Sequence, residues 1–206
     1  AGCTTCEGQL GDISIRERNL LGRGQDLRLA FLISGGTQEI DLSFTEPYFL
    51  ERNVAAGFDL FRVERDNQDR SSFDQKSVGG ALRLGYQITE NLRQTLRYTL
   101  REDEITNIDE SASRLIRDQE GKRTTSLIGQ TLFYDRRDNR IDPTEGYYLS
   151  LTTDLAGLGG SSRYGRVRTG AGYYYPVAQG WVVAVSGEVG AIEGIGKDVG
   201  IQDRFF

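Results

Sequence analysis

The segment that decides the fold reads Tyr134-Asp-Arg-Arg-Asp-Asn-Arg-Ile-Asp-Pro-Thr-Glu-Gly-Tyr147. A strand-like run ends at Tyr134 and another begins at Tyr147, with clustered charges between them. Pro143 fixes its own φ for a turn and Gly146 can adopt a positive φ, so the chain can reverse direction here. Aromatic rings at both mouths of the turn suit a membrane–water interface, where a ring has one wet and one apolar side.

The run from Leu92 to Arg101 alternates between apolar and charged residues. Leu92, Leu96, Tyr98 and Leu100 share one face with Gln94, and Arg93, Thr95, Arg97, Thr99 and Arg101 share the other. Three arginines on one face need water or carboxylate partners, because an unpaired charge in a dry core is costly. A sheet with one lipid-facing side and one wet side satisfies both faces. We therefore predict that the three arginines face a lumen, either paired with Asp41, Asp59, Asp135 or Glu188 or lining an anion pore.

The same period of two recurs along the chain and predicts an all-β fold. We expect eleven strands, at roughly 1–6, 11–17, 26–34, 38–45, 54–65, 73–87, 92–103, 123–135, 147–155, 164–175 and 181–192. Short connections favour an antiparallel meander, in which turns holding Pro47, Pro143 and Pro176 would all lie at one end, the periplasmic one. Single-chain bacterial outer-membrane barrels have even strand numbers, so an odd count predicts an incomplete transmembrane β-barrel, a curved open sheet.

Composition agrees with strands that cross a membrane and excludes several other classes. The mean hydropathy is −0.46, and no apolar run approaches the ~20 residues of a membrane helix. A net charge of −5 disfavours nucleic acid as a partner. The chain has no His, which removes Ser–His catalysis and the usual His metal sites, and we expect neither an enzyme nor a cofactor. It also has no Met, so we expect a piece of a longer protein.

Three local patterns have competing interpretations. Cys3 and Cys6 would lie ~10 Å apart in a strand, too far for a disulfide, so we expect small strand residues there rather than a redox or metal pair. The acidic cluster 102–104, with Asp109 and Glu110, lacks the spacing of a calcium loop and predicts a solvated loop instead of a metal site. Helical spacing of Ala112, Leu115 and Ile116, with a capping box at Asn107 and an end at Gly121, predicts a short surface helix.

Three segments together resemble the barrel of the BamA family, the outer-membrane β-barrel assembly factors. Gly11-Asp-Ile-Ser-Ile-Arg-Glu-Arg-Asn-Leu-Leu-Gly-Arg-Gly24 is similar to the second strand of that barrel and its turn, and Phe44-Thr-Glu-Pro-Tyr-Phe49 to the turn after the fourth. The signature turn after the eighth strand matches at Asp135, Arg137, Asp138, Asp142, Pro143 and Gly146.

The resemblance implies the first eleven strands of a sixteen-stranded barrel, without the POTRA domains that precede it or the Arg-Gly-Phe loop that follows. It also implies a protein of the outer membrane of a Gram-negative bacterium that folds and inserts β-barrel proteins. Substrate strands would pair with the edge strand formed by Ala1, Gly2, Cys3, Thr4, Thr5 and Cys6. The implied partners are nascent outer-membrane proteins, assembly lipoproteins and outer-membrane lipid. A sister exporter or passive pore is the alternative.

Overall fold

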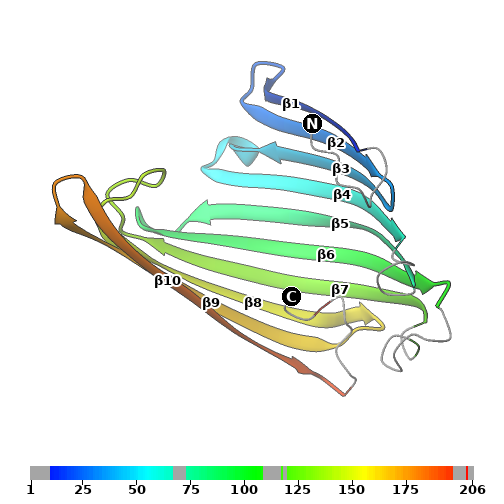
Figure 1. The fold of residues 1–206 in the computed structure, drawn as a ribbon. Helices are drawn as coiled ribbons and strands as arrows, with labels where there is room; N and C mark the ends of the chain where they lie inside the picture. The colour runs from blue at the N-terminus through cyan, green and yellow to red at the C-terminus, as the bar shows by residue number, and fades with distance from the viewer. Residues whose placement is uncertain (1–9, 67–72, 109–116, 118–119, 197–202, 204–206) are drawn as a thin grey trace.

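The computed structural model describes residues 10–66, 73–108, 117, 120–196 and 203 of the chain (Figure 1). Ten strands form in this part: β1 (Gly11–Leu20), β2 (Gln25–Ser34), β3 (Thr37–Glu46), β4 (Val54–Asp66), β5 (Asp74–Gln87), β6 (Leu92–Thr106), β7 (Gly121–Asp135), β8 (Gly146–Gly160), β9 (Tyr164–Ala178) and β10 (Trp181–Gly194). A 3-10 turn, η1 (Phe49–Glu51), precedes β4. The ten strands match the second to eleventh predicted ones; the strand predicted at 1–6 lies outside the described residues.

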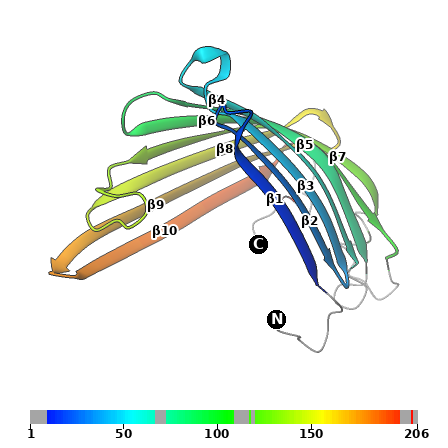
Figure 2. The same cartoon turned by 90° about the horizontal axis from the view of Figure 1, so that it is seen from above.

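The strands form one antiparallel sheet in the order β1 to β10, each paired with its neighbour in sequence. Figure 2 shows that the sheet curves strongly, so that it has a convex and a concave face. Within the described residues β1 and β10 are not paired with each other, and the sheet is open. The predicted all-β meander and curved open sheet are therefore confirmed.

Five connections lie together at one end of the strands, here called the Pro143 edge (Figure 1): 21–24, 47–53, 88–91, 136–145 and 179–180. Pro47 and Pro143 occupy these turns, as predicted. The placement of Pro176 in a turn was wrong, because Pro176 lies inside β9 and pairs with Val182. The register shifts next to this pair, since Ala178 pairs with Trp181. Proline is tolerated at such a bulge, where its missing N–H leaves no ladder bond unmade.

The prediction of a solvated acidic loop at 102–104 was also wrong. These residues belong to β6, and Asp103 is only 2% exposed. Residue Gly121 begins β7. Asn107 has φ +53°, unlike the extended backbone of an N-cap, and its side-chain amide donates to Asp74 at 2.6 Å. The predicted helix residues Ala112, Leu115 and Ile116 lie outside the described part.

The two faces of the sheet differ in polarity. Apolar side chains stand exposed on the convex face, among them Ile13, Ile15, Phe31, Ile33, Ile40, Leu60, Leu82, Leu100, Ile128, Leu149, Val167, Val183, Val185 and Val189. The buried apolar cluster is small: Leu127, Ala156 and Tyr164. Apolar surface thus faces outward, as expected for strands in lipid. None of the helical structure in the described ranges is long and apolar enough to cross a membrane.

Aromatic side chains gather where the convex face meets the Pro143 edge. The rings of Tyr134 and Tyr147 lie 6.0 Å apart, and Tyr147 pairs in register with Tyr173. Tyr175 and Trp181 are exposed nearby, on β9 and at the start of β10. Such a belt is typical of the boundary between lipid and water.

Candidate functional site

The concave face encloses an open groove of about 960 Å³ lined mainly by charged and hydroxyl side chains. Its cations are Arg16, Arg28, Arg83, Arg97, Arg101, Arg166 and Arg168, and its carboxylates are Asp26, Glu39, Asp41, Asp59, Asp154 and Asp203. Alternation along each strand places these groups opposite the exposed apolar band. The groove is therefore a water-compatible surface built on a membrane-compatible sheet.

Arg83 on β5 and Arg97 on β6 are paired directly in register, and both contact Asp59 on β4. The Arg83 Nη2 donates to Asp59 Oδ1 at 2.9 Å, to Ser43 Oγ at 3.1 Å and to Thr45 Oγ1 at 3.2 Å. Arg97 reaches the same carboxylate only at 3.4 Å and has 53% of its side chain exposed. One carboxylate therefore serves two arginines, and Arg83 holds it more closely.

A second ion cluster lies toward the opposite edge of the sheet, on β5 and β6. The Arg101 Nε donates to Asp103 Oδ2 at 2.7 Å, and the Ser77 hydroxyl donates to Asp103 Oδ1. Asp103 is buried, so these two donors replace the water that its carboxylate gives up.

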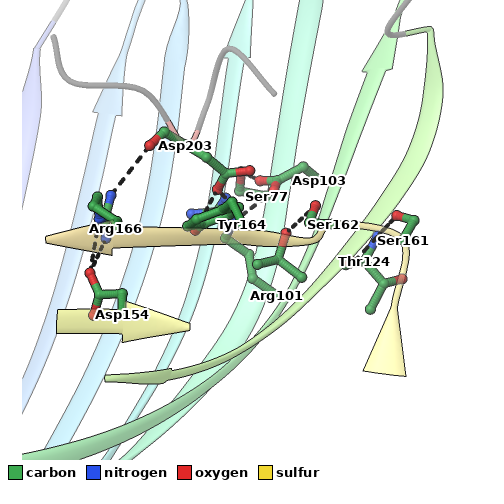
Figure 3. Close-up of polar contacts among 11 residues, drawn as sticks. Ser77, Arg101, Asp103, Thr124, Asp154, Ser161, Ser162, Tyr164, Arg166 and Asp203 are labelled. Carbon is green, nitrogen blue, oxygen red and sulfur yellow. Dashed lines mark hydrogen bonds and ion pairs between the residues drawn. The ribbon is translucent and has the colours of Figure 1, made fainter. Parts of the chain in front are cut away.

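Asp203 joins this cluster from far along the chain (Figure 3). Its Oδ1 accepts from Arg101 Nη2 at 2.8 Å and from the Tyr164 hydroxyl at 3.1 Å. Its main-chain carbonyl accepts from Arg166 Nη1 at 3.3 Å, while Arg166 Nε donates to Asp154 at 2.8 Å. Asp203 thus connects β6 and β9 across the groove, with 2% of its surface exposed.

Arg93 lies at the Pro143 edge of the same face. It lines two smaller pockets, of about 380 and 220 Å³. Among the described residues its guanidinium makes no ion pair or hydrogen bond, unlike Arg97 and Arg101.

The turn at 136–145 is held by one carboxylate. Asp138 Oδ1 accepts from the main-chain N–H groups of Thr144 and Glu145, both at 3.0 Å, and Oδ2 accepts from the Thr144 hydroxyl at 2.6 Å. These donors, the hydroxyl first, hold the pKa of Asp138 well below its ordinary value. Gly146 has φ +105°, and a Cβ there would clash with the carbonyl oxygen of Arg136.

Asp135 and Arg137 form a second fixed pair at this turn. Arg137 donates from Nε and Nη2 to the two Asp135 oxygens, each at 2.9 Å, and this hydrogen bonding raises the pKa of Arg137. The same guanidinium lies 5.1 Å from the centroid of the Tyr148 ring. Arg140 approaches Asp135 at 3.4 Å. The Arg137 side chain therefore connects Asp135, at the end of β7, to Tyr148 on β8.

The structure brings the predicted signature residues together in one turn. Asp135, Arg137, Asp138 and Gly146 have the contacts given above, and Asp142 contributes its main-chain N–H, 3.4 Å from Asn139 Oδ1. Arg97 and Arg101 line the groove, whereas Ala1, Gly2, Cys3, Thr4, Thr5 and Cys6 lie outside the described residues.

Sequence reasoning missed Arg83, Tyr164, Arg166 and Asp203 as parts of the ion network. Alternation could have placed Arg83 and Arg166 on the concave face, because each shares a strand face with other polar residues. Nothing in the sequence around Asp203 indicates its partners, since they lie 37 to 102 residues away. In the described ranges no cluster of three or more potential metal-binding residues occurs.

Comparisons with known proteins agree with this architecture. Residues 19–206 match the family model of the Omp85 superfamily domain. The chain is 26% identical over 201 residues to the outer membrane protein assembly factor BamA of Neorickettsia risticii, covering 97% of this chain and 27% of that protein. It is 28% identical over 182 residues to a SAM50-like protein of Drosophila melanogaster, covering 85% of this chain and 41% of that protein.

The fold is shared with a solved structure. The crystal structure of BamA from Haemophilus ducreyi lacking POTRA domains 1-3 superposes with a TM-score of 0.79 at 23% sequence identity, covering 94% of this chain and 40% of that one. The chain spans only part of each relative that it matches. Because the family model covers most of its length, the chain belongs to the Omp85 superfamily.

Proposed function

We propose that this chain is the N-terminal part of an outer-membrane β-barrel, within a longer protein that folds and inserts other β-barrel proteins. The observation that carries the proposal is an open sheet with apolar residues outside and a charged groove inside. The names of the bacterial relatives, outer membrane protein assembly factors, support it.

The proposed chemistry is backbone pairing, without a catalytic side chain. A strand at the edge of a sheet presents unpaired N–H and C=O groups that can template an incoming strand. We assign this role to the edge at residues 1–6, which would meet the last strand of the complete barrel at a seam that opens sideways. A locally thinned bilayer next to the seam would lower the cost of inserting new strands.

The proposed partners are nascent outer-membrane β-barrel proteins and the surrounding lipid. Assembly lipoproteins would bind mainly through POTRA domains that precede the barrel in the longer protein. The proposed location is the outer membrane of a Gram-negative bacterium. The BamA proteins of Neorickettsia risticii and Haemophilus ducreyi support a bacterial source, although the SAM50-like relative is from a fly.

The test is site-specific photo-crosslinking in the longer protein. A photoreactive residue at Thr4 is expected to capture the terminal strand of a client barrel during folding, and the same probe at Ile40, in the middle of the sheet, is not. Capture at neither position, or equally at both, would contradict pairing at the edge. Ion conductance with transport of one dedicated partner and no acceleration of client folding would favour the exporter or pore instead.

A further inference from the structure

On the concave face near the Pro143 edge, Arg83, Arg93 and Arg97 stand close together, and within the described residues Asp59 is the one carboxylate that contacts any of them. Arg83 and Arg97 stand directly opposite each other on neighbouring strands, an arrangement that costs stability when nothing compensates it. Arg83 engages both carboxylate oxygens of Asp59. Arg97 is left half exposed with a single contact at 3.4 Å.

Arg93 extends this excess of positive charge toward the edge. It lies on the same strand face as Arg97, four residues away, which is roughly 13 Å along a strand. Thr95 lies between them and presents a hydroxyl on that face. The pocket of about 380 Å³ beside Arg93 is lined by Arg83, Arg93 and Thr95 among others, and none of its lining residues is acidic. The smaller pocket on its other side includes Glu90 and Asp135, but Asp135 is already paired with Arg137 and Arg140.

Glycines on the neighbouring strands make space for side chains beside these guanidinium groups. Gly85 pairs in register with Thr95, and Gly129 pairs with Arg97. A Cβ at Gly57 would lie 3.2 Å from Arg83 Nη2 and 2.5 Å from the carbonyl oxygen of Phe44. The Asp154 carboxylate takes up the space at Gly129, and the ring of Phe133 stands beside Arg93 on β7, in register with it. At Gly85 a Cβ would meet nothing closer than 3.7 Å, so the open stretch of wall beside the two arginines lies on the β5 side.

We propose that Arg93 and Arg97 bind carboxylates of an unfolded polypeptide that enters the groove from the Pro143 edge. Guanidinium groups suit carboxylates because they can donate two parallel hydrogen bonds. In an extended peptide two side chains four residues apart share one face at the same spacing as the two arginines. The inference rests on the proposed function, since it names how a client chain is held before its strands pair.

A polypeptide fits this surface better than a lipid does. The broad exposed apolar band stands on the convex face, whereas the apolar lining beside Arg93 consists of the small residues Pro47, Ala55 and Ala56 and the ring of Phe133. Long acyl chains would therefore find their larger apolar surface on the other side of the sheet. A polypeptide rich in polar residues would meet mainly hydroxyl and charged groups in the groove.

The test uses the longer protein in detergent micelles and a fluorescent, extended Ser/Thr peptide with two aspartates four residues apart. A matched peptide carries asparagines. The acidic peptide is expected to bind roughly tenfold more tightly, and this preference should vanish with the double substitution Arg93→Gln and Arg97→Gln. The charge-matched control is Arg62→Gln with Lys76→Gln, because both contact Glu64 away from the groove and should keep the preference.

Two results would overturn the site. One is an unchanged preference in a folded double variant. The other is displacement of the peptide by inorganic phosphate far beyond that by sodium chloride of equal ionic strength, which would indicate a site for free anions. If the double variant does not fold, Arg93→Gln alone applies the same criterion, because it removes no observed contact, and it should lower the preference severalfold.

Acceleration of client folding by the unsubstituted protein is measured separately. If the protein accelerates folding but does not prefer the acidic peptide, the carboxylate site is refuted and the proposed function stands. If the protein prefers the acidic peptide but does not accelerate folding, the proposed function is refuted and the carboxylate site stands.

Discussion

The guanidinium of Arg101 donates a hydrogen bond at 2.8 Å to the carboxylate of Asp203, which lies 102 residues further along the chain. Asp203 is 2% exposed and also accepts from the hydroxyl of Tyr164. Its second oxygen, Oδ2, accepts no hydrogen bond within the described residues. A single carboxylate thus joins β6 to β9 through one oxygen, and its charge is balanced mainly by Arg101.

Removing this carboxylate should destabilise the sheet. Asp203→Ala leaves the Arg101 guanidinium with Asp103 alone and removes the acceptor of Tyr164. The expected loss is about 1–3 kcal/mol, below that of a dry buried pair because the groove admits water. Urea unfolding of the barrel in micelles would measure it.

The substitution Asp203→Asn separates charge from hydrogen bonding. Its amide oxygen can still accept from Arg101 and Tyr164, while the nitrogen takes the place of an oxygen that has no donor. We expect the free energy of unfolding of the asparagine variant to lie between that of the unsubstituted protein and that of the alanine variant. An asparagine variant as unstable as the alanine variant would show that the charge, and not the hydrogen bonds, holds Asp203 in place.

Gly146 should tolerate no side chain. It combines φ +105° with a close approach to the Arg136 carbonyl, so Gly146→Ala adds both backbone strain and a clash. We expect a loss of about 1–3 kcal/mol. The control is Gly165→Ala on β9, where a Cβ would meet nothing within 4 Å and φ is not positive. Equal melting temperatures for the two variants would contradict the strained turn.

The Asp138 carboxylate should keep its turn intact in acid. The pKa of Asp138 is lower in the folded protein than in the unfolded chain, where it is about 4. The carboxylate therefore contributes fully to the stability of the turn above pH ~4, and this contribution is lost as the pH falls through the pKa of the folded protein. Asp138→Asn removes the acceptor of the Thr144 hydroxyl at every pH. Amide exchange at Thr144 and Glu145 should therefore be faster in the variant, with the two proteins converging only well below pH ~4. Convergence near pH 4 would refute the lowered pKa.

The strands could be predicted from sequence because alternation is a local property. A residue's face depends only on its parity along the strand, which is why Arg97 and Leu100 were assigned to opposite faces. The same rule extends to Asp103, two residues beyond Arg101, but its charged neighbours favoured a loop. Charge on both faces at the end of a strand looks like a solvated segment unless the partners are known.

The partners of the groove residues could not be predicted, because they depend on register between strands. Arg83 and Asp59 meet because β4 and β5 pair with one particular offset, and slipping by one residue would send one of them to the other face. Asp203 lies still further from any local signal. Pro176 misled the prediction since a bulge admits proline inside a strand as well as a turn does.

The convex face should reject charge in its middle and accept it at its rim. Leu82 is 62% exposed on β5, so in water Leu82→Arg would cost little. In a lipid bilayer the same substitution should cost about 2–4 kcal/mol, because the guanidinium would face hydrocarbon. Leu21→Arg is the matched control: Leu21 is 82% exposed in the turn after β1, where the side chain can reach water. Reversible unfolding in phospholipid vesicles measures both changes. Equal, small losses would mean that Leu82 does not face lipid, and the assignment of the exposed apolar band to a membrane would then fail.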